Sequence, residues 1–163
     1  MSETSTLLFR TADAGDIPGI RFVDPLTRAD PDRAQRIASA LQNGDCIVAC
    51  DGDEILGFAI LNYTFFDQGF VALLVVGAGS RRRGIATALL AEVERRCAKP
   101  KLYVSANQSN LPAQCLFEKC GFVRSGRVEN LDVDDTELLY FKQISVSSGR
   151  AFKEARSGRR TIQ

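Results

Sequence analysis

The stretch FVALLVVGAGSRRRGIATALL, residues 70–90, decides the fold of this chain. Its apolar, valine-rich start at residues 70–76 predicts a strand buried on both faces, and an apolar residue at every fourth position of residues 83–97 predicts a helix. A glycine-containing turn with three arginines joins the two. A strand that turns into a helix N-terminus presents unpaired N–H groups and the positive end of the helix dipole, and both favour a phosphate. We therefore expect a polyphosphate-bearing cofactor or substrate here.

The composition indicates one domain, residues 1–144, and a short basic segment, residues 145–163. The chain has 163 residues, of which 45% are hydrophobic, which suffices for one core. A net charge of +1 gives no case for nucleic acid or a membrane as partner. No apolar run has the length of a membrane span, and no signal peptide is recognisable, so we expect a soluble, cytoplasmic protein. The basic segment is expected to be mobile or loosely docked.

The residue types that are missing exclude several chemistries. The chain has no histidine, so Ser–His and Cys–His nucleophilic catalysis are excluded, and the commonest zinc ligand is absent. The five cysteines are odd in number and contain no CxxC pair, so we expect buried free thiols rather than a metal or disulfide site.

Hydrophobic periodicity and turn signals predict a mixed α/β sheet with helices on both faces. Asp51-Gly52 and the acidic turn at residues 132–135 predict two hairpins, and Asp30-Pro31 predicts a helix start. Strands are expected at residues 7–10, 46–50, 54–62, 70–76, 102–105, 122–128 and 137–142. Helices are expected at residues 13–26, 31–43, 83–97 and 113–120, the first of them weak and broken near Pro18.

Three kinds of phosphate-binding loop compete for residues 77–86. A Walker loop requires Lys and then Ser or Thr where Ile85 and Ala86 stand. A dinucleotide-binding loop requires a third glycine where Arg82 stands, and the next strand ends without the acidic residue that binds a ribose. The third pattern, Arg or Gln-x-x-Gly-x-Gly or Ala, is satisfied by Arg81, Gly84 and Ala86.

This third pattern resembles the acetyl-CoA loop of the GNAT superfamily of N-acetyltransferases. SANQSNLPA at residues 105–113 and LFEKCGF at residues 116–122 resemble the second cofactor motif of that superfamily. FRTAD at residues 9–13 and the segments 129–132 and 138–142 are similar to bacterial members. The resemblance covers about residues 7–144 and implies a mostly antiparallel sheet of about seven strands with about four helices.

The resemblance implies acetyl-CoA as a co-substrate and no metal. The pyrophosphate would bind the backbone N–H groups of residues 82–87, and the pantetheine arm would lie along residues 74–76. Asn110 is either a cofactor ligand, which we favour, or a helix N-cap, and Asn107 is open between ligand and structural roles. The expected cofactor-binding residues are Leu74, Val75, Val76, Arg81, Arg82, Arg83, Gly84, Ile85, Ala86, Thr87, Asn107, Asn110 and Phe117.

Transfer of an acetyl group from a thioester to an amine needs a polarised carbonyl, a base and a proton for the thiolate. The N–H of Val76 is the expected oxyanion donor, a role that contributes about 3 kcal/mol. Many relatives carry a Tyr at position 117 that protonates the thiolate; Phe117 cannot, which leaves water for that step.

The sequence offers several candidates for the general base and for the acceptor. Asp67, Glu129 and Asp132 are the candidate bases, with Tyr63 and Tyr140 as further alternatives. The acceptor is a primary amine on a small metabolite, an antibiotic, a protein N-terminus or a lysine. It would be selected by the N-terminal helices and the loops at residues 62–69 and 128–135.

Three other functions compete with acetyl transfer. Phe117 and the lack of histidine are compatible with a non-catalytic acyl-CoA-binding module. Gly77 and Gly79 are compatible with a dinucleotide-binding protein, and the basic segment with an RNA-binding arm. The resemblance also admits a homodimer.

Overall fold

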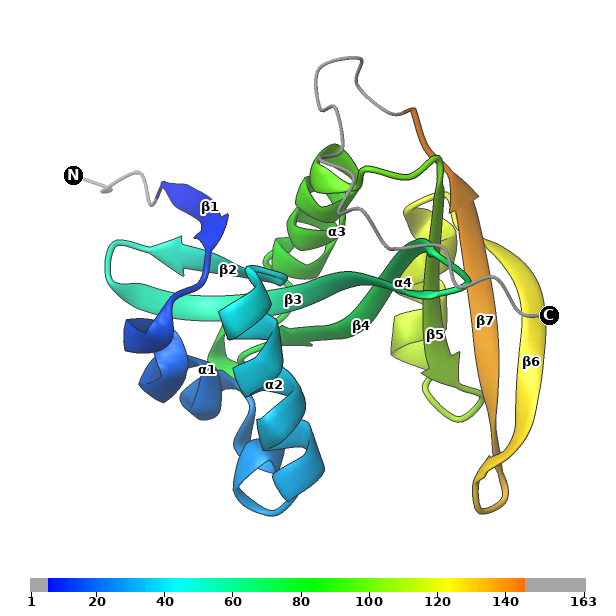
Figure 1. Cartoon of the computed structure of the whole chain (residues 1–163), viewed down its shortest axis with the longest axis horizontal. Helices are drawn as coiled ribbons and strands as arrows, with labels where there is room; N and C mark the ends of the chain where they lie inside the picture. The colour runs from blue at the N-terminus through cyan, green and yellow to red at the C-terminus, as the bar shows by residue number, and fades with distance from the viewer. Residues whose placement is uncertain (1–5, 146–163) are drawn as a thin grey trace, which may run out of the picture.

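The computed structural model describes residues 6–145, which form a seven-stranded sheet with helices on both faces (Figure 1). The strands are β1 (Leu7–Thr11), β2 (Cys46–Asp51), β3 (Glu54–Phe65), β4 (Gln68–Val76), β5 (Lys101–Asn107), β6 (Val123–Asp132) and β7 (Asp135–Gln143). The helices are α1 (Ile17–Val23), α2 (Pro31–Asn43), α3 (Ile85–Arg96) and α4 (Leu111–Lys119). Three short 3-10 turns, η1 (Ala14–Asp16), η2 (Pro25–Arg28) and η3 (Ala78–Ser80), complete the order.

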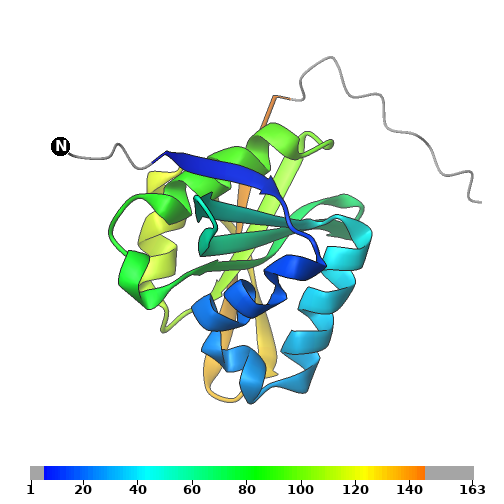
Figure 2. The same cartoon turned by 90° about the vertical axis from the view of Figure 1, so that its left-hand side faces the viewer.

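The strands lie in the order β1-β2-β3-β4-β5-β7-β6, and all neighbours are antiparallel except β4 and β5. Helices α1 and α2 cover one face, over a core that includes Ile20, Ile37 and Phe58. Helices α3 and α4 cover the other face, over a core that includes Leu89 and Tyr140. Figure 2 shows the two helix pairs on opposite sides of the sheet. The predicted fold class is therefore confirmed.

The local sequence signals set the helix ends. The Asp30 side chain accepts a hydrogen bond from the N–H of Arg33 over 3.0 Å and caps α2. Gly44 ends the same helix with a φ of 74°, a left-handed conformation that glycine adopts without strain. The helix expected at residues 13–26 is instead divided into η1, α1 and η2, and prolines stand at the starts of α1 and η2.

Three of the five cysteines, Cys46, Cys50 and Cys97, are buried free thiols as expected. Burial raises the pKa of the Cys46 thiol to about 12, so this thiol is inert at neutral pH. The expectation was wrong for Cys115, which is exposed on α4, and Cys120 is half-buried. No helix among residues 6–145 is long and apolar enough to cross a membrane. The basic segment lies outside the described residues except for Ser145.

The sheet opens between its two parallel strands. Strand β4 pairs with β5 only from Gly69 to Val71, opposite residues Leu102 to Val104. Beyond Val71, β4 continues to pair with β3 as far as Val76, but β5 no longer accompanies it. The second half of β4 therefore has one unpaired edge, and this edge positions the candidate site.

Candidate functional site

The open edge of β4 presents the backbone groups of Leu74 and Val76. The N–H of Gly77 donates to the carbonyl of Leu56 on β3 over 2.9 Å, so Gly77 faces β3. Backbone groups alternate sides along a strand, so Val75 also faces β3, whereas Leu74 and Val76 face the open side. Of the three expected residues of this strand, two thus have backbone groups free to bond a ligand, and one of these is Val76.

The turn after β4 leads into a helix start with unsatisfied donors. Gly84 is the N-cap of α3 with a φ of 76°, and no side chain caps the helix. The first helical bond runs from the N–H of Ala88 to the carbonyl of Gly84, so the N–H groups of Ile85, Ala86 and Thr87 have no acceptor within the helix. A Cβ at Gly84 would meet no atom within 4 Å, which leaves open space above these donors.

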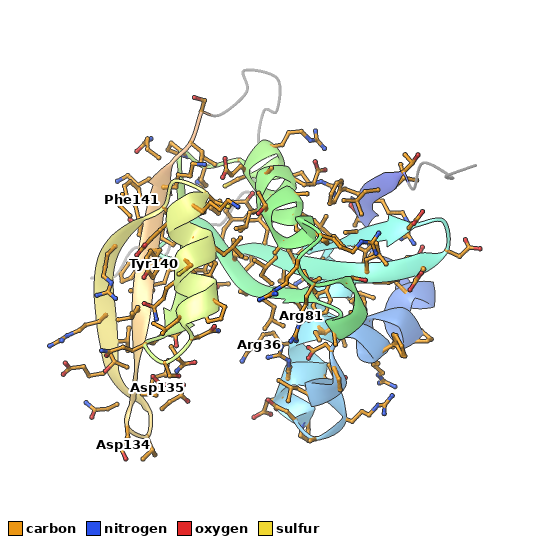
Figure 3. All side chains as sticks on the ribbon, turned by 180° about the vertical axis from the view of Figure 1, so that it is seen from behind. Arg36, Arg81, Asp134, Asp135, Tyr140 and Phe141 are labelled. Carbon is orange, nitrogen blue, oxygen red and sulfur yellow. The ribbon has the colours of Figure 1, made fainter. Side chains whose placement is uncertain are left out.

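A continuous groove joins the strand edge to the helix start. One part, of about 590 Å³, lies between the segment Val23–Leu26, the end of β4 and the first turns of α4. The other part, of about 410 Å³, lies over the N-terminus of α3 and reaches Lys119 at the end of α4. The two parts share Val76, Arg81, Ala86, Pro112 and Leu116. Figure 3 shows Arg81 near α3 on this side of the molecule.

The two ends of the groove differ in chemistry. The end at α3 combines N–H donors with the cationic side chains of Arg81, Arg82 and Lys119, which suits a pyrophosphate. The longer part is lined mostly by apolar side chains, among them Leu116 and Phe117, and suits an apolar chain. The groove therefore fits a long ligand that is anionic at one end and largely uncharged at the other.

An ion pair with a buried carboxylate, which no sequence pattern predicted, lies in the longer part of the groove. The Asp24 carboxylate accepts a hydrogen bond from Nε of Arg33 over 2.7 Å, and the Asp24 side chain is only 3% exposed. Both residues line the groove together with the end of β4. Asp24 precedes a proline in a segment whose apolar periodicity was weak, so no sequence pattern distinguished it from a surface residue.

The two asparagines make structural contacts. The Asn110 side chain caps α4 by accepting a hydrogen bond from the N–H of Ala113 over 3.2 Å, which is the N-cap role, the alternative to the ligand role that the resemblance favours. Asn107 donates from Nδ2 to Oδ2 of Asp132 over 2.7 Å. Neither side chain lines the groove, whereas the helix that Asn110 caps does.

Phe117 lies in the groove wall and in the core at once. Its side chain is 3% exposed, and its ring packs 5.5 Å from that of Tyr140 and 6.1 Å from that of Phe122. It thus supplies an apolar wall and no proton. The buried Tyr140 hydroxyl has no hydrogen-bond partner within residues 6–145, but Tyr140 does not line the groove.

The three expected carboxylate bases lie in different places. Asp67 stands in the β3–β4 turn, at the opposite end of β4, roughly 25 Å from Leu74–Val76 at about 3.3 Å per residue. Glu129 is exposed on β6 and pairs with Arg127 over 2.8 Å. Asp132 is tied to the end of β5 through Asn107. Glu129 and Asp132 both lie toward the end of the sheet that opens, because Val128, next to Glu129, pairs with Glu137, which pairs with Asn107 at the end of β5. Burial raises the pKa of Tyr63, whose hydroxyl accepts from the N–H of Ala98, away from the groove.

Solved structures of acetyltransferases share this fold. A GNAT family acetyltransferase from Bacillus cereus is 31% identical, with a TM-score of 0.80 over 86% of this chain and 99% of that one. A protein from Salmonella typhimurium, solved with its cofactor acetyl-CoA, is 16% identical, with a TM-score of 0.68 over 87% of this chain and 96% of that one.

Curated relatives match shorter stretches. GCN5-related N-acetyltransferase 6 of Arabidopsis thaliana is 40% identical over 78 residues, or 45% of this chain and 27% of that protein. N-alpha-acetyltransferase 30 of Xenopus laevis is 29% identical over 106 residues, or 60% of this chain and 38% of that protein. L-2,4-diaminobutyric acid acetyltransferase of Shouchella clausii is 39% identical over 79 residues, or 45% of this chain and 44% of that protein. The chain thus matches less than half the length of each of these three relatives.

The family model for the acetyltransferase (GNAT) family matches residues 16–122. That range begins before α1 and ends just after α4, so it contains both parts of the groove, the open edge of β4 and the uncapped start of α3. The loop motif and the second motif around α4 both lie within it. This chain therefore belongs to the GNAT family of acetyltransferases.

Proposed function

We propose that this chain transfers the acetyl group of acetyl-CoA to the primary amine of an acceptor, by direct attack in a ternary complex. The observation that carries the proposal is the continuous groove, which joins an open strand edge to a helix start with three unbonded N–H groups. In this proposal the pyrophosphate accepts hydrogen bonds from residues 85–87, beside Arg81 and Lys119. The pantetheine arm follows the backbone of Leu74 and Val76.

The reaction forms one C–N bond and breaks one C–S bond. The amine nitrogen attacks the thioester carbon, and the N–H of Val76 stabilises the charge that develops on the carbonyl oxygen. The C–S bond then breaks, and the amine proton passes to a carboxylate. Because Phe117 has no proton to give, water relays that proton from the carboxyl group to the thiolate, which restores the carboxylate and leaves no hydroxide. The products are an N-acetylated acceptor and the free thiol of CoA.

We propose that Asp24 is the general base, which accepts the amine proton directly or through one water molecule. Asp24 is the carboxylate that lines the groove beside the end of β4, and Arg33 fixes its position. Asp67, Glu129 and Asp132, which the sequence suggested, are the alternatives. Among these, Asp132 is best placed, since its contact with Asn107 holds it near the end of β5.

The class of acceptor stays broad. The relatives differ among themselves, since one is named an N-alpha-acetyltransferase and another an acetyltransferase of L-2,4-diaminobutyric acid. A primary amine on a small molecule or a protein is common to both. The five free cysteines favour a reducing compartment such as the cytoplasm, which supports the proposed location, and the Bacillus cereus neighbour supports a bacterial-type enzyme.

Two measurements on the full chain test the proposal. In thermal unfolding, acetyl-CoA should raise the melting temperature, whereas NAD and ATP at equal concentration should leave it unchanged. With a panel of amines, release of free CoA thiol should exceed the amine-free rate for at least one compound. Stabilisation without thiol release from any amine would favour a non-catalytic acyl-CoA-binding module. Stabilisation by NAD alone would contradict the assignment of the groove.

A further inference from the structure

The ion pair of Asp24 and Arg33 leaves part of each side chain unused. Nε of Arg33 donates to Oδ2 of Asp24 over 2.7 Å, and neither side chain makes a further hydrogen bond within residues 6–145. The pair of Arg10 and Asp16 is different, because Nη1 and Nη2 of Arg10 bind both carboxylate oxygens of Asp16. In the described chain, Oδ1 of Asp24 and the two Nη groups of Arg33 are therefore without a partner.

These unused groups belong to the groove wall beside the proposed reaction centre. Asp24 directly follows α1, and Arg33 stands in the first turn of α2. Both line the part of the groove that contains the end of β4, where Val76 would hold the thioester carbonyl. The Arg33 side chain is only 20% exposed, so its guanidinium is poorly hydrated. A half-buried cation with free N–H donors favours a ligand group that accepts hydrogen bonds and carries a negative charge.

We propose that the acceptor is a free α-amino acid, whose carboxylate binds the two Nη groups of Arg33 while its amine lies at Oδ1 of Asp24. This inference rests on the proposed function and names the class of acceptor that the same site takes. The end of a guanidinium presents two parallel N–H groups, which match the two oxygens of a carboxylate. The Asp24 carboxylate accepts a hydrogen bond from the amine and then takes its proton.

The contact between Asp24 and Arg33 sets the spacing of the groups on the acceptor. Because the two side chains touch, a ligand that binds both at once needs an amine and an anion that are close neighbours. In an α-amino acid a single carbon separates the amine from the carboxylate, which satisfies this condition. The amine of a lysine side chain in a protein has no such neighbour. The N-terminus of a protein carries an uncharged amide in place of the carboxylate.

The charge of the groove agrees with this class of acceptor. Among the described residues that line this part of the groove, Asp24 is acidic, whereas Arg33 and Arg81 are basic. The reactive form of an α-amino acid has a neutral amine and one negative charge, which an excess of positive charge favours. A polyamine carries positive charges alone, and the same excess disfavours it. The groove thus selects against polycationic amines.

Kinetics with matched pairs of acceptors test the proposal. The full chain is assayed for release of CoA thiol with a set of L-α-amino acids, each compared with its own α-amide. The amide keeps the amine and the side chain but loses the negative charge. Its amine is also less basic, and thus more often neutral, so reactivity alone would favour the amide. For the best pair of the set, we expect kcat/KM to be about tenfold higher or more for the amino acid than for its amide.

Arg33→Lys tests the role of the guanidinium. Lysine keeps a positive charge for Asp24 but lacks the paired N–H groups that bind a carboxylate. In this variant the ratio of kcat/KM between amino acid and amide should fall to near one, while activity on the amide and acetyl-CoA affinity stay near wild type. Arg28→Lys is the matched control, because Arg28 is exposed in η2 and lines neither part of the groove. It should keep the wild-type ratio.

The outcomes separate this inference from the function on which it rests. Equal kcat/KM for amino acid and amide in the wild type would overturn the inference and leave acetyl transfer intact, as would an Arg33→Lys variant that keeps the full preference. Lost acetyl-CoA affinity in Arg33→Lys, with the preference unchanged, would also overturn it and assign the guanidinium to the cofactor. Thiol release from no amine at all would contradict the proposed function itself. Circular dichroism verifies the fold of each variant.

Discussion

Asn107 donates a hydrogen bond to Asp132 over 2.7 Å and thereby ties the end of β5 to the β6–β7 hairpin. A second hydrogen bond joins the same two segments, since the Ser109 hydroxyl donates to Asp135 over 2.5 Å. The hairpin carries the exposed apolar side chains of Leu131 and Val133. These hydrogen bonds hold the β6–β7 hairpin at the end of the sheet where β4 and β5 separate. The hairpin is therefore placed to contact an acceptor.

Replacement of Asp132 by Ala should change acceptor binding more than chemistry. We expect the acceptor KM to rise several-fold, with kcat and acetyl-CoA affinity little changed, because the hairpin loses its hydrogen bond from Asn107 and keeps those from Ser109 to Asp135. Steady-state kinetics with an amine found in the acceptor screen provides the measurement, and Asp53→Ala, in the distant β2–β3 turn, is the control. A hundredfold loss in kcat at constant KM would instead identify Asp132 as the base.

Replacement of Asp24 by Asn should lower kcat at least a hundredfold, with acetyl-CoA affinity retained, because the amide cannot accept the amine proton. The amide oxygen keeps an acceptor for Arg33, which limits the structural damage. Asp16→Asn is the matched control, since Asp16 is also a buried carboxylate in an ion pair, with Arg10 at 2.6 Å, away from the groove. A similar loss in kcat in both variants would show that Asp24 matters through stability alone.

Replacement of Gly84 by Glu should abolish acetyl-CoA binding and leave the fold intact. The added carboxylate would stand over the N–H groups that we assign to the pyrophosphate, in space that is now open. The left-handed backbone should cost roughly 1–2 kcal/mol of stability in addition.

Gly52→Glu separates these two effects of the Gly84 substitution. Gly52 has a φ of 56°, and a Cβ there also meets no atom within 4 Å, but it lies in the β2–β3 turn. Isothermal titration should show lost binding in Gly84→Glu and wild-type affinity in Gly52→Glu. Wild-type affinity of Gly84→Glu for acetyl-CoA would contradict the proposal that the start of α3 binds the pyrophosphate.

Glu92 on α3 should make stability depend on pH in the acid range. Hydrogen bonds from Arg95, and further from Arg96, lower the pKa of this carboxyl to about 2 from 4.5. The group is more acidic folded than unfolded, so its contribution is present above about pH 4.5 and is lost as the pH falls through about 2. Glu92→Gln should therefore be about 1 kcal/mol less stable than wild type at pH 7, and this gap should close in acid. Urea unfolding at several pH values measures this difference in the free energy of unfolding. A difference that does not depend on pH would contradict the lowered pKa of Glu92.

The sequence predicted the scaffold because its signals are local. The apolar run of β4, the cap at Asp30 and the hairpin at Asp51-Gly52 each depend on neighbours in the chain, and each appears in the structure as expected. The first helix was predicted less well, because prolines at residues 18 and 25 divide it and only tertiary contacts decide where each piece ends.

The groove was predictable only in part. Its phosphate end lies in one continuous motif, whereas its other end combines β4 with residues 23–26 and α4, which are distant in the chain. Asp24 and Arg33 are nine residues apart in a segment without clear periodicity, so their pairing and burial follow from the fold alone. The same holds for the ring contacts among Phe65, Phe70, Tyr103 and Phe141, which come from four separate strands.

A crystal structure with acetyl-CoA tests the central claim most directly. We predict pyrophosphate oxygens about 3 Å from the N–H groups of Ala86 and Thr87, and the pantetheine arm beside the backbone of Leu74 and Val76. A cofactor bound at another surface, or a groove that stays empty at saturating acetyl-CoA, would contradict the account.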